Sequence, residues 1–249
     1  MLRSLQEMIG YGISARDDEL GKVADLYFDD QSFAVRYFVV KTGGWLSGRE
    51  VLISPVEAGE PDPEGEVLPV DLTREQVEDS PEVDADLPVS RRAEQDLTTY
   101  YRWPPSWTPV GSGGIVGLKV PPAYGEPEEP EAVIGEEGDT HLRSFREVQG
   151  YSVQATDRSA GEVEDMLTRP DEWVIRYLVV DTAEWLSGRK ILVSPAWVTA
   201  MHWSAGEVEV DLPAAAIETS PELDPDAPVS REYEERLHDH YDRPKYWEV

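Results

Sequence analysis

Hydrophobic and polar positions alternate along several short stretches near the start of the chain. The clearest are residues 11–16, 23–28 and 33–40, which are separated by a glycine or by a polar turn. Alternation with a period of two predicts β-strands with one buried face. Residues 50–55 continue the pattern up to a proline, which cannot lie in mid-sheet, and residues 66–72 alternate well. Five or six short strands joined by tight turns predict a small antiparallel barrel, because closure removes exposed sheet edges.

The segment after these strands predicts short helices. Thr73 begins a Thr-x-x-Gln sequence, which is typical of a helix capping box. Ser90 can cap a helix over residues 91–101, and Ser230 can cap one over residues 231–241. Both helices end close to a proline, as helices commonly do. The predicted barrel therefore carries a helical extension on its C-terminal side.

The pentapeptide Trp-Leu-Ser-Gly-Arg occurs at 45–49 and again at 185–189. The second copy begins 140 positions after the first, and we call this distance the repeat offset. The same offset aligns Arg-Tyr-Phe-Val-Val at 36–40 with Arg-Tyr-Leu-Val-Val at 176–180. Internal repeats of this length indicate domains, because solenoid units are much shorter and need three or more copies. The chain is thus predicted to be a tandem duplication.

We expect a mainly β protein with short helices, built as two small antiparallel β-barrels that each carry a C-terminal helical extension. The first repeat covers residues 1–108 and the second covers residues 142–249. Between them, residues 109–141 are rich in proline, glycine and glutamate, a composition typical of an extended acidic linker. The two repeats are expected to pack as an intramolecular pseudo-dimer with pseudo-twofold symmetry.

The chain is strongly acidic. Its formal net charge is −29, from 51 acidic and 22 basic residues, and its pI is about 4.3. Such a charge disfavours nucleic acids and anionic membrane surfaces, and it favours a basic protein partner. The chain has no cysteine, no apolar run long enough to span a membrane and no recognisable signal sequence at its start. We therefore expect a cytoplasmic protein with no direct membrane insertion.

The repeated pentapeptide has two interpretations. In the functional one, the tryptophans anchor a partner and the arginines bind its carboxylates. In the structural one, glycine bends a tight turn, tryptophan closes the barrel end and arginine pairs with a nearby acid. The residues concerned are Trp45, Gly48, Arg49 and Asp25 in the first repeat, and Trp185, Gly188, Arg189 and Asp165 in the second. We favour the structural one, because the residues just before the pentapeptide differ between the copies.

The candidate metal ligands do not have the residue spacings of known metal-binding motifs. The aspartates at 84 and 86 suggest a calcium loop, but an EF-hand needs glycine at its sixth and glutamate at its twelfth position, which hold valine and glutamine here. His238 and His240 are two residues apart, so a helix would point them in different directions, and we expect a surface helix. No nucleophile elbow or acid–base pair is recognisable. We therefore predict no catalytic, metal-binding or cofactor-binding residues.

Taken together, the motifs resemble one family. A Gly-x-Val-x-Asp sequence at 21–25, then Arg-Tyr-x-Val-Val, then Trp-Leu-Ser-Gly-Arg and a strand ending in Ser-Pro resemble the PRC-barrel family. The resemblance covers residues 2–107 and 142–248. The family includes the cytoplasmic barrel of the photosynthetic reaction-centre H subunit and the C-terminal domain of RimM-type ribosome maturation factors. The resemblance implies a binding or scaffolding barrel and supplies no catalytic motif for this chain.

The favoured function is therefore a non-catalytic protein-interaction or scaffold module that recognises a protein partner. One alternative is an accessory protein of the photosynthetic reaction-centre and electron-transport apparatus, which rests on the family resemblance alone. Another is a small-molecule or metal-binding enzyme, which would need a concave pocket with convergent polar groups in at least one barrel. A role in ribosome assembly would have to run through a ribosomal protein, because the charge disfavours RNA.

Overall fold

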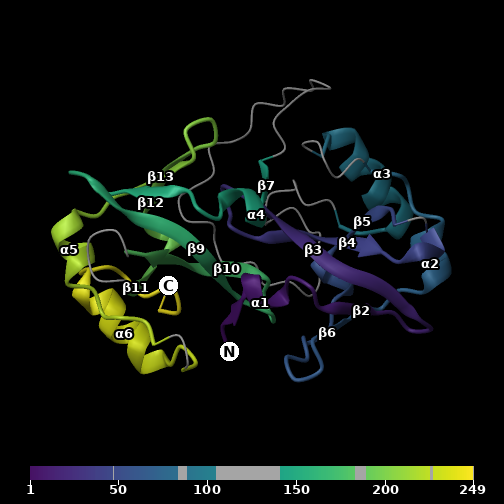
Figure 1. The fold of residues 1–249 in the computed structure, drawn as a ribbon, viewed down its shortest axis with the longest axis horizontal. Helices are drawn as coiled ribbons and strands as arrows, with labels where there is room; N and C mark the ends of the chain where they lie inside the picture. Colours follow the sequence, from purple (N-terminus) through teal and green to yellow (C-terminus); the bar gives the residue numbers. More distant parts are fainter. Residues whose placement is uncertain (47, 84–88, 105–140, 183–188, 225–226, 249) are drawn as a thin grey trace. The chain divides into compact units, whose positions relative to one another are not determined.

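The computed structural model describes residues 1–46, 48–83, 89–104, 141–182, 189–224 and 227–248. These residues form two β-sheets with only short helices (Figure 1), which confirms the mainly β fold class. Closure of each sheet into a barrel stays a prediction. The predicted linker lies outside the described residues, except for His141 at its end.

The described chain divides into two compact units. Unit 1 contains Met1–Ser4, Glu147–Arg169 and Ile175–Val249, and unit 2 contains Leu5–Arg146 and Pro170–Val174. Each unit therefore takes its residues from both sequence repeats. The first four residues of the chain group with the second repeat, and the first residues of the second repeat group with the first.

Unit 2 is built on a six-stranded sheet in which β5, β4, β3, β2 and β6 are neighbours in that order and β7 also pairs with β3. The pairs are antiparallel, except that β2 and β6 are parallel. The strands are β2 (Gly12–Ser14), β3 (Glu19–Asp29), β4 (Val35–Thr42), β5 (Glu50–Ile53), β6 (Val67–Pro69) and β7 (Leu142–Ser144). The strands predicted from alternation are thus present. The stretches 23–28 and 33–40 lie in the long β3–β4 pair and its turn.

One glycine of the repeated Gly-x-Val-x-Asp sequence has a clear structural reason. Gly21 has a φ of 155°, and a Cβ at this position would collide with the backbone carbonyl of Lys41 on the neighbouring strand. Gly161 has a φ of 125° and would meet the carbonyl of Asp181 in the same way. Close approach of two strands therefore demands glycine at this place in both units.

Short helices follow the sheet of unit 2. They are α1 (Leu5–Met8), η1 (Gly44–Leu46), η2 (Pro55–Glu57), α2 (Arg74–Glu78) and α3 (Arg91–Tyr101). The capping box of Thr73 is confirmed, because its side chain accepts from Gln76 while the Gln76 side chain accepts from the backbone of Thr73. Ser90 caps α3 by accepting from the backbone N–H of Ala93. The sequence thus encodes where both helices begin.

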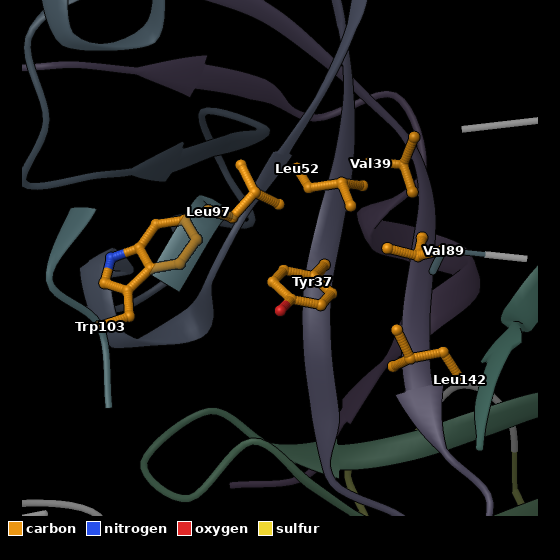
Figure 2. Packing of buried hydrophobic residues seen from close by; sticks show 7 residues of the cluster. All are labelled: Tyr37, Val39, Leu52, Val89, Leu97, Trp103 and Leu142. Atoms are coloured by element: carbon orange, nitrogen blue, oxygen red, sulfur yellow. The ribbon is translucent and has the colours of Figure 1, made fainter. Parts of the chain in front are cut away.

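The helical extension of unit 2 covers one face of its sheet. Figure 2 shows the buried side chains of this contact, which are arranged around Tyr37. They are Tyr37, Val39, Leu52, Val89, Leu97, Trp103 and Leu142. They come from β4, β5, α3, the segments that flank α3, and β7. Burial of each such large apolar side chain contributes about 1.5–3 kcal/mol, so the extension is part of the fold.

Unit 1 repeats this order of elements. Its strands are β1 (Arg3–Ser4), β8 (Ser152–Gln154), β9 (Ser159–Arg169), β10 (Val174–Asp181), β11 (Lys190–Val193), β12 (Val198–His202) and β13 (Glu207–Val210). They are ordered β11, β10, β9, β8, β13, β12, and β1 also pairs with β9. Its helices are α4 (Phe145–Val148), which begins in unit 2, η3 (Pro195–Trp197), α5 (Ala214–Glu218) and α6 (Arg231–His240). Ser230 caps α6 as predicted, while α5 has no side-chain cap.

Candidate functional site

The turn that holds the first Trp-Leu-Ser-Gly-Arg copy is partly described. Gly48 has a φ of 72°, and among the described residues no atom beyond its chain neighbours lies within 4 Å of the position that a Cβ would take. Its left-handed backbone, rather than lack of space, is therefore what glycine satisfies here. Ser47 and the side chain of Trp45 lie outside the described residues, as does the segment 183–188 with Trp185 and Gly188.

Arg49 ties this turn to the end of α2. Its Nη2 atom donates to the carbonyl oxygens of Val77 at 3.2 Å and Ser80 at 3.3 Å, and to the Ser80 hydroxyl at 3.0 Å. Its Nη1 atom lies 3.8 Å from a carboxylate oxygen of Glu82, which is exposed. The guanidinium adds a donor to carbonyls at and just after the last turn of α2, where the Val77 carbonyl also accepts from the backbone N–H and the hydroxyl of Ser80.

Arg189 does the same in unit 1. It donates to the carbonyl oxygens of Glu218 at 2.9 Å and Ser220 at 2.8 Å, and its Nε lies 3.3 Å from Glu222. The acids near the two arginines are thus Glu82 and Glu222, in place of Asp25 and Asp165, which the sequence suggested. The arginines turn toward the helix after the sheet, because the carbonyls at that helix end offer several acceptors to one guanidinium fork.

Asp25 and Asp165 instead hold serines at the edge of the sheet. Asp25 accepts from the Ser144 hydroxyl at 2.5 Å and from the backbone N–H of Arg146 at 3.2 Å. Asp165 accepts from the Ser4 hydroxyl at 2.5 Å. Burial raises the pKa of the Asp25 carboxyl, and the hydrogen bonds from Ser144 and the backbone oppose that rise. The two aspartates are therefore docking points for short strands.

A patch on unit 2 combines acids with an exposed aromatic ring. Tyr100 is 38% exposed, packs edge-on against Tyr101 at 4.8 Å and donates its hydroxyl to a backbone carbonyl of α2. Burial and the negative charges of Asp79 and Glu75 raise its pKa. Burial raises the pKa of Tyr101 to about 12, and the charge of Glu57 adds to that rise. We call these five residues the acidic–aromatic surface.

The corresponding patch on unit 1 keeps the geometry and loses the charge. His240 stands at the position of Tyr100, and its Nε2 lies 2.9 Å from the carbonyl oxygen of Ala216. Tyr100 makes the matching 2.9 Å bond to the carbonyl oxygen of Gln76. Ala215 and Thr219 stand at the positions that the repeat offset pairs with Glu75 and Asp79, and Trp197 stands at the position of Glu57. An acidic–aromatic surface is therefore a property of unit 2.

A sequence model of the PRC-barrel domain matches residues 3–77, the segment that carries β2 to β6, the pentapeptide turn and most of α2. Residues 3–77 are a PRC-barrel domain. An uncharacterized protein of Deinococcus radiodurans is similar to this chain, with 41% identity over 76 residues. The match covers 30% of this chain and 26% of that relative, so the chain covers about a quarter of the relative's length. No helix in the described ranges has the length and apolar character to span a membrane.

The helix that follows the PRC-barrel domain sends a carboxylate back into it. Glu94 of α3 is buried, and it accepts from Arg36 at 3.1 Å and from the Tyr37 hydroxyl at 3.2 Å. Arg36 also pairs with Asp29 at 3.3 Å. Burial raises the pKa of Glu94, while the charge of Arg36 opposes the rise. The PRC-barrel domain and its helical extension are thus joined by a buried ion pair as well as by apolar packing.

Unit 1 has a richer version of this network. Glu234 accepts from the hydroxyls of Tyr177 at 3.2 Å and Tyr246 at 2.7 Å. The Tyr177 oxygen also lies 3.0 Å from Nε2 of His238, whose Nδ1 lies 2.8 Å from the carbonyl oxygen of Pro244. The expectation of a surface position for His238 is wrong, because its side chain is 2% exposed. Its spacing of four residues from Glu234 places both on the inward face of α6.

These buried polar groups were missed, although the sequence carried a signal for them. The Arg-Tyr pair opens both copies of Arg-Tyr-x-Val-Val, and Glu94 recurs as Glu234 at the repeat offset. Among the described residues, no group of three or more acids and histidines is arranged to hold a metal ion. Asp84, Asp86 and Asp226 lie outside those residues.

Proposed function

We propose that this chain is a non-catalytic protein-interaction or scaffold module of the cytoplasm whose partner carries positive charge. The net charge of −29 supports a basic partner, because complementary charge speeds encounter and selects among partners. The PRC-barrel domain adds support, since the family resemblance implies binding or scaffolding. The proposed partner presents lysine or arginine side chains beside at least one apolar residue.

The observation that carries the proposal is the acidic–aromatic surface of unit 2. Tyr100 offers an exposed ring, and Glu75 and Asp79 lie close enough to raise its pKa. Aromatic side chains dominate many interfaces, because they bury a large area at a small cost in side-chain entropy. Acids around such a ring favour a partner whose cations surround an apolar anchor.

The candidate chemical groups are engaged inside the fold, which supports a role other than catalysis. Arg49 holds the end of α2, and Glu94 holds α3 to the sheet through Arg36. Such groups orient and stabilise the elements that carry the acidic–aromatic surface. Tyr100 itself lies on α3, so this internal framework fixes the position of the proposed anchor.

A capture experiment with matched variants tests the proposal. The full chain is immobilised and exposed to native extract, and bound proteins are identified and quantified by mass spectrometry. The variant Glu75→Lys/Asp79→Lys reverses two charges on the acidic–aromatic surface. The control Ala215→Lys/Thr219→Lys adds two cations at the corresponding places of unit 1. We expect basic partners to be lost with the first variant and kept with the second.

The same capture separates this proposal from the alternatives. Ala215→Lys/Thr219→Lys changes the net charge by +2 and Glu75→Lys/Asp79→Lys by +4. Loss of partners with both variants in proportion to these changes would mean that overall charge drives binding, and the assignment to Tyr100 and its acids would fail. Recovery of reaction-centre subunits as the main partners would favour the photosynthetic alternative. Tyr100→Ala and His240→Ala remove the same hydrogen bond from the two units, and only Tyr100→Ala is expected to weaken capture.

A further inference from the structure

The edge of β3 in unit 2 holds a strand that comes from the other sequence repeat. β7 pairs with it antiparallel, and the ladder joins Tyr27 to Ser144, Phe28 to Arg143 and Asp29 to Leu142. Main-chain pairing to a sheet edge is a general mode of peptide recognition, in which side chains of the added strand supply specificity. The edge of β3 is therefore a strand-acceptor site that is filled within this chain.

Three consecutive side chains of β7 are recognised. Leu142 is buried in the apolar cluster around Tyr37. Arg143 lies with its Nε 2.9 Å from a carboxylate oxygen of Asp30. Ser144 donates its hydroxyl to Asp25 at 2.5 Å. An apolar contact, an ion pair and a hydrogen bond thus select the sequence Leu-Arg-Ser, beyond what backbone pairing alone would do.

Unit 1 contains the reciprocal arrangement. β1 pairs with β9, and the ladder joins Arg3 to Thr168 and Ser4 to Leu167. Under the repeat offset, these partners correspond to the Phe28–Arg143 and Tyr27–Ser144 pairs of unit 2. Ser4 also donates to Asp165, as Ser144 does to Asp25. Both copies of Leu-Arg-Ser are therefore donor strands for an acceptor in the other repeat.

A third pairing also joins the two repeats at positions that are related by the repeat offset. The isolated antiparallel bridge in unit 2 joins Ala34 to Val174, and the repeat offset makes these two positions equivalent. A residue that pairs with its own equivalent is the signature of an isologous contact between two copies. The three pairings therefore share the register that two separate copies of one repeat would use on each other.

We propose that the β3 and β9 edges are acceptors for the Leu-Arg-Ser segment of a second copy of the repeat, and that this chain is a strand-exchanged homodimer in covalent form. Each half of the sequence completes the sheet of the other. The link through residues 105–140 is then unnecessary for association, and the two halves remain together as separate chains after that link is cut.

The two acceptors differ in strength. Asp30, which pairs with Arg143, is replaced by Pro170 at the equivalent position, and β1 forms a shorter ladder than β7. Leu142 is buried, whereas Leu2 is only partly buried. The acceptor on β3 therefore provides most of the association, and variants of Asp25 and Asp30 are the sharpest probes of it.

Cleavage of the folded full chain tests the proposal. A protease site is inserted within residues 109–140, the purified protein is cut, and native mass spectrometry and gel filtration follow the fragments on dilution. We expect a 1:1 complex of the two fragments at micromolar concentration. Separation of the fragments at that concentration, whether or not they stay folded, would overturn the proposal.

Two controls identify the acceptor as the cause of association. Asp25→Ala/Asp30→Ala is expected to raise the dissociation constant of the cut fragments at least tenfold. Glu60→Ala/Glu64→Ala, which removes two exposed acids of the same unit, is expected to leave it unchanged. A synthetic peptide with the sequence of residues 141–147 should compete with reassociation, and a scrambled peptide should not. Equal effects of the two double variants, or equal competition by both peptides, would contradict the assigned site.

Discussion

Trp103 and Trp197 pack against equivalent tyrosines from two different positions in the fold. Trp103, at the end of α3, lies 4.2 Å from Tyr101, and Trp197, in η3, lies 4.7 Å from Tyr241. Glu57 stands in unit 2 where Trp197 stands in unit 1, and it accepts a 2.7 Å hydrogen bond from the Trp103 indole. Each unit thus packs a tryptophan against this tyrosine, although the tryptophan comes from a different position in the sequence.

Removal of either tryptophan should destabilise its own unit. Trp103→Ala leaves a cavity against Tyr37 and Tyr101 and is expected to cost about 3–5 kcal/mol of unfolding free energy. Urea titration of the full chain with hydrogen-exchange detection would assign the loss to unit 2. Val56→Ala, at an exposed side chain of the same unit, should change stability by less than about 0.5 kcal/mol. Similar losses in the two variants would contradict the packing account.

Arg49 should resist conservative replacement. Lysine keeps the charge but lacks the planar fork, so Arg49→Lys is expected to lose the bonds to the Ser80 carbonyl and hydroxyl and one of several bonds to the Val77 carbonyl. The expected cost is about 1–3 kcal/mol. Amide exchange around α2 should speed up with this variant. Arg92→Lys, at an exposed position on α3, serves as the control. Full stability of Arg49→Lys would show that charge alone suffices at the turn.

The buried histidine makes unit 1 sensitive to mild acid. Burial lowers the pKa of His238 below its ordinary value of 6.5, against the opposing charge of Glu234, while the nearby Lys245 adds to the lowering. Its stabilising contribution is therefore complete above pH 6.5 and is lost as the pH falls through the lowered pKa. His238→Gln should remove this loss of stability between neutral and mildly acidic pH.

Denaturant titrations of wild type and His238→Gln over that pH range check the prediction. The glutamine amide can donate to the Pro244 carbonyl oxygen and to the Tyr177 oxygen, whose own hydrogen goes to Glu234, so the variant is expected to fold. His240→Gln is the matched control, since His240 is exposed on the same helix. An identical pH dependence in wild type and His238→Gln would contradict the role given to His238.

The contribution of Glu94 to stability depends on pH in the opposite direction to that of His238. Burial raises its pKa above the ordinary value of 4.5, so its contribution is complete below that value and is lost as the pH rises through the raised pKa. Glu94→Gln cannot titrate at this position, so the stability of wild type relative to the variant, measured by denaturant titration, should fall from pH 4 toward neutral pH. A relative stability that rises with pH would show that the pairing with Arg36 outweighs burial.

Much of the sheet could be predicted from the sequence, because long half-buried strands leave a period of two. Residues 23–28 and 33–40 carry that pattern. They lie in the β3–β4 pair, except for residues 33–34, which belong to the turn between the two strands. The capping box at Thr73 was also predicted, since capping depends on neighbours in sequence.

Long-range contacts could not be predicted in this way. β1 and β7 are too short to show a period, and their partners lie in the other repeat, far away in sequence. The partner of Arg49 was missed for a similar reason, because the end of α2 is distant in sequence and offers backbone atoms, which leave no residue signature. The inward direction of His238 follows from its spacing to Glu234. The sequence does not show that both residues contact Tyr177, which is distant in sequence.

We propose that unit 2 binds a basic partner through Tyr100 and the acids around it. The most direct measurement is the dissociation constant of the captured partner for the full chain, by calorimetry at low and at high salt. For wild type, we expect weaker binding at high salt, and for Glu75→Lys/Asp79→Lys we expect a loss of at least tenfold in affinity. Ala215→Lys/Thr219→Lys should bind like wild type. Equal affinity for the wild type and Glu75→Lys/Asp79→Lys would show that the partner binds elsewhere.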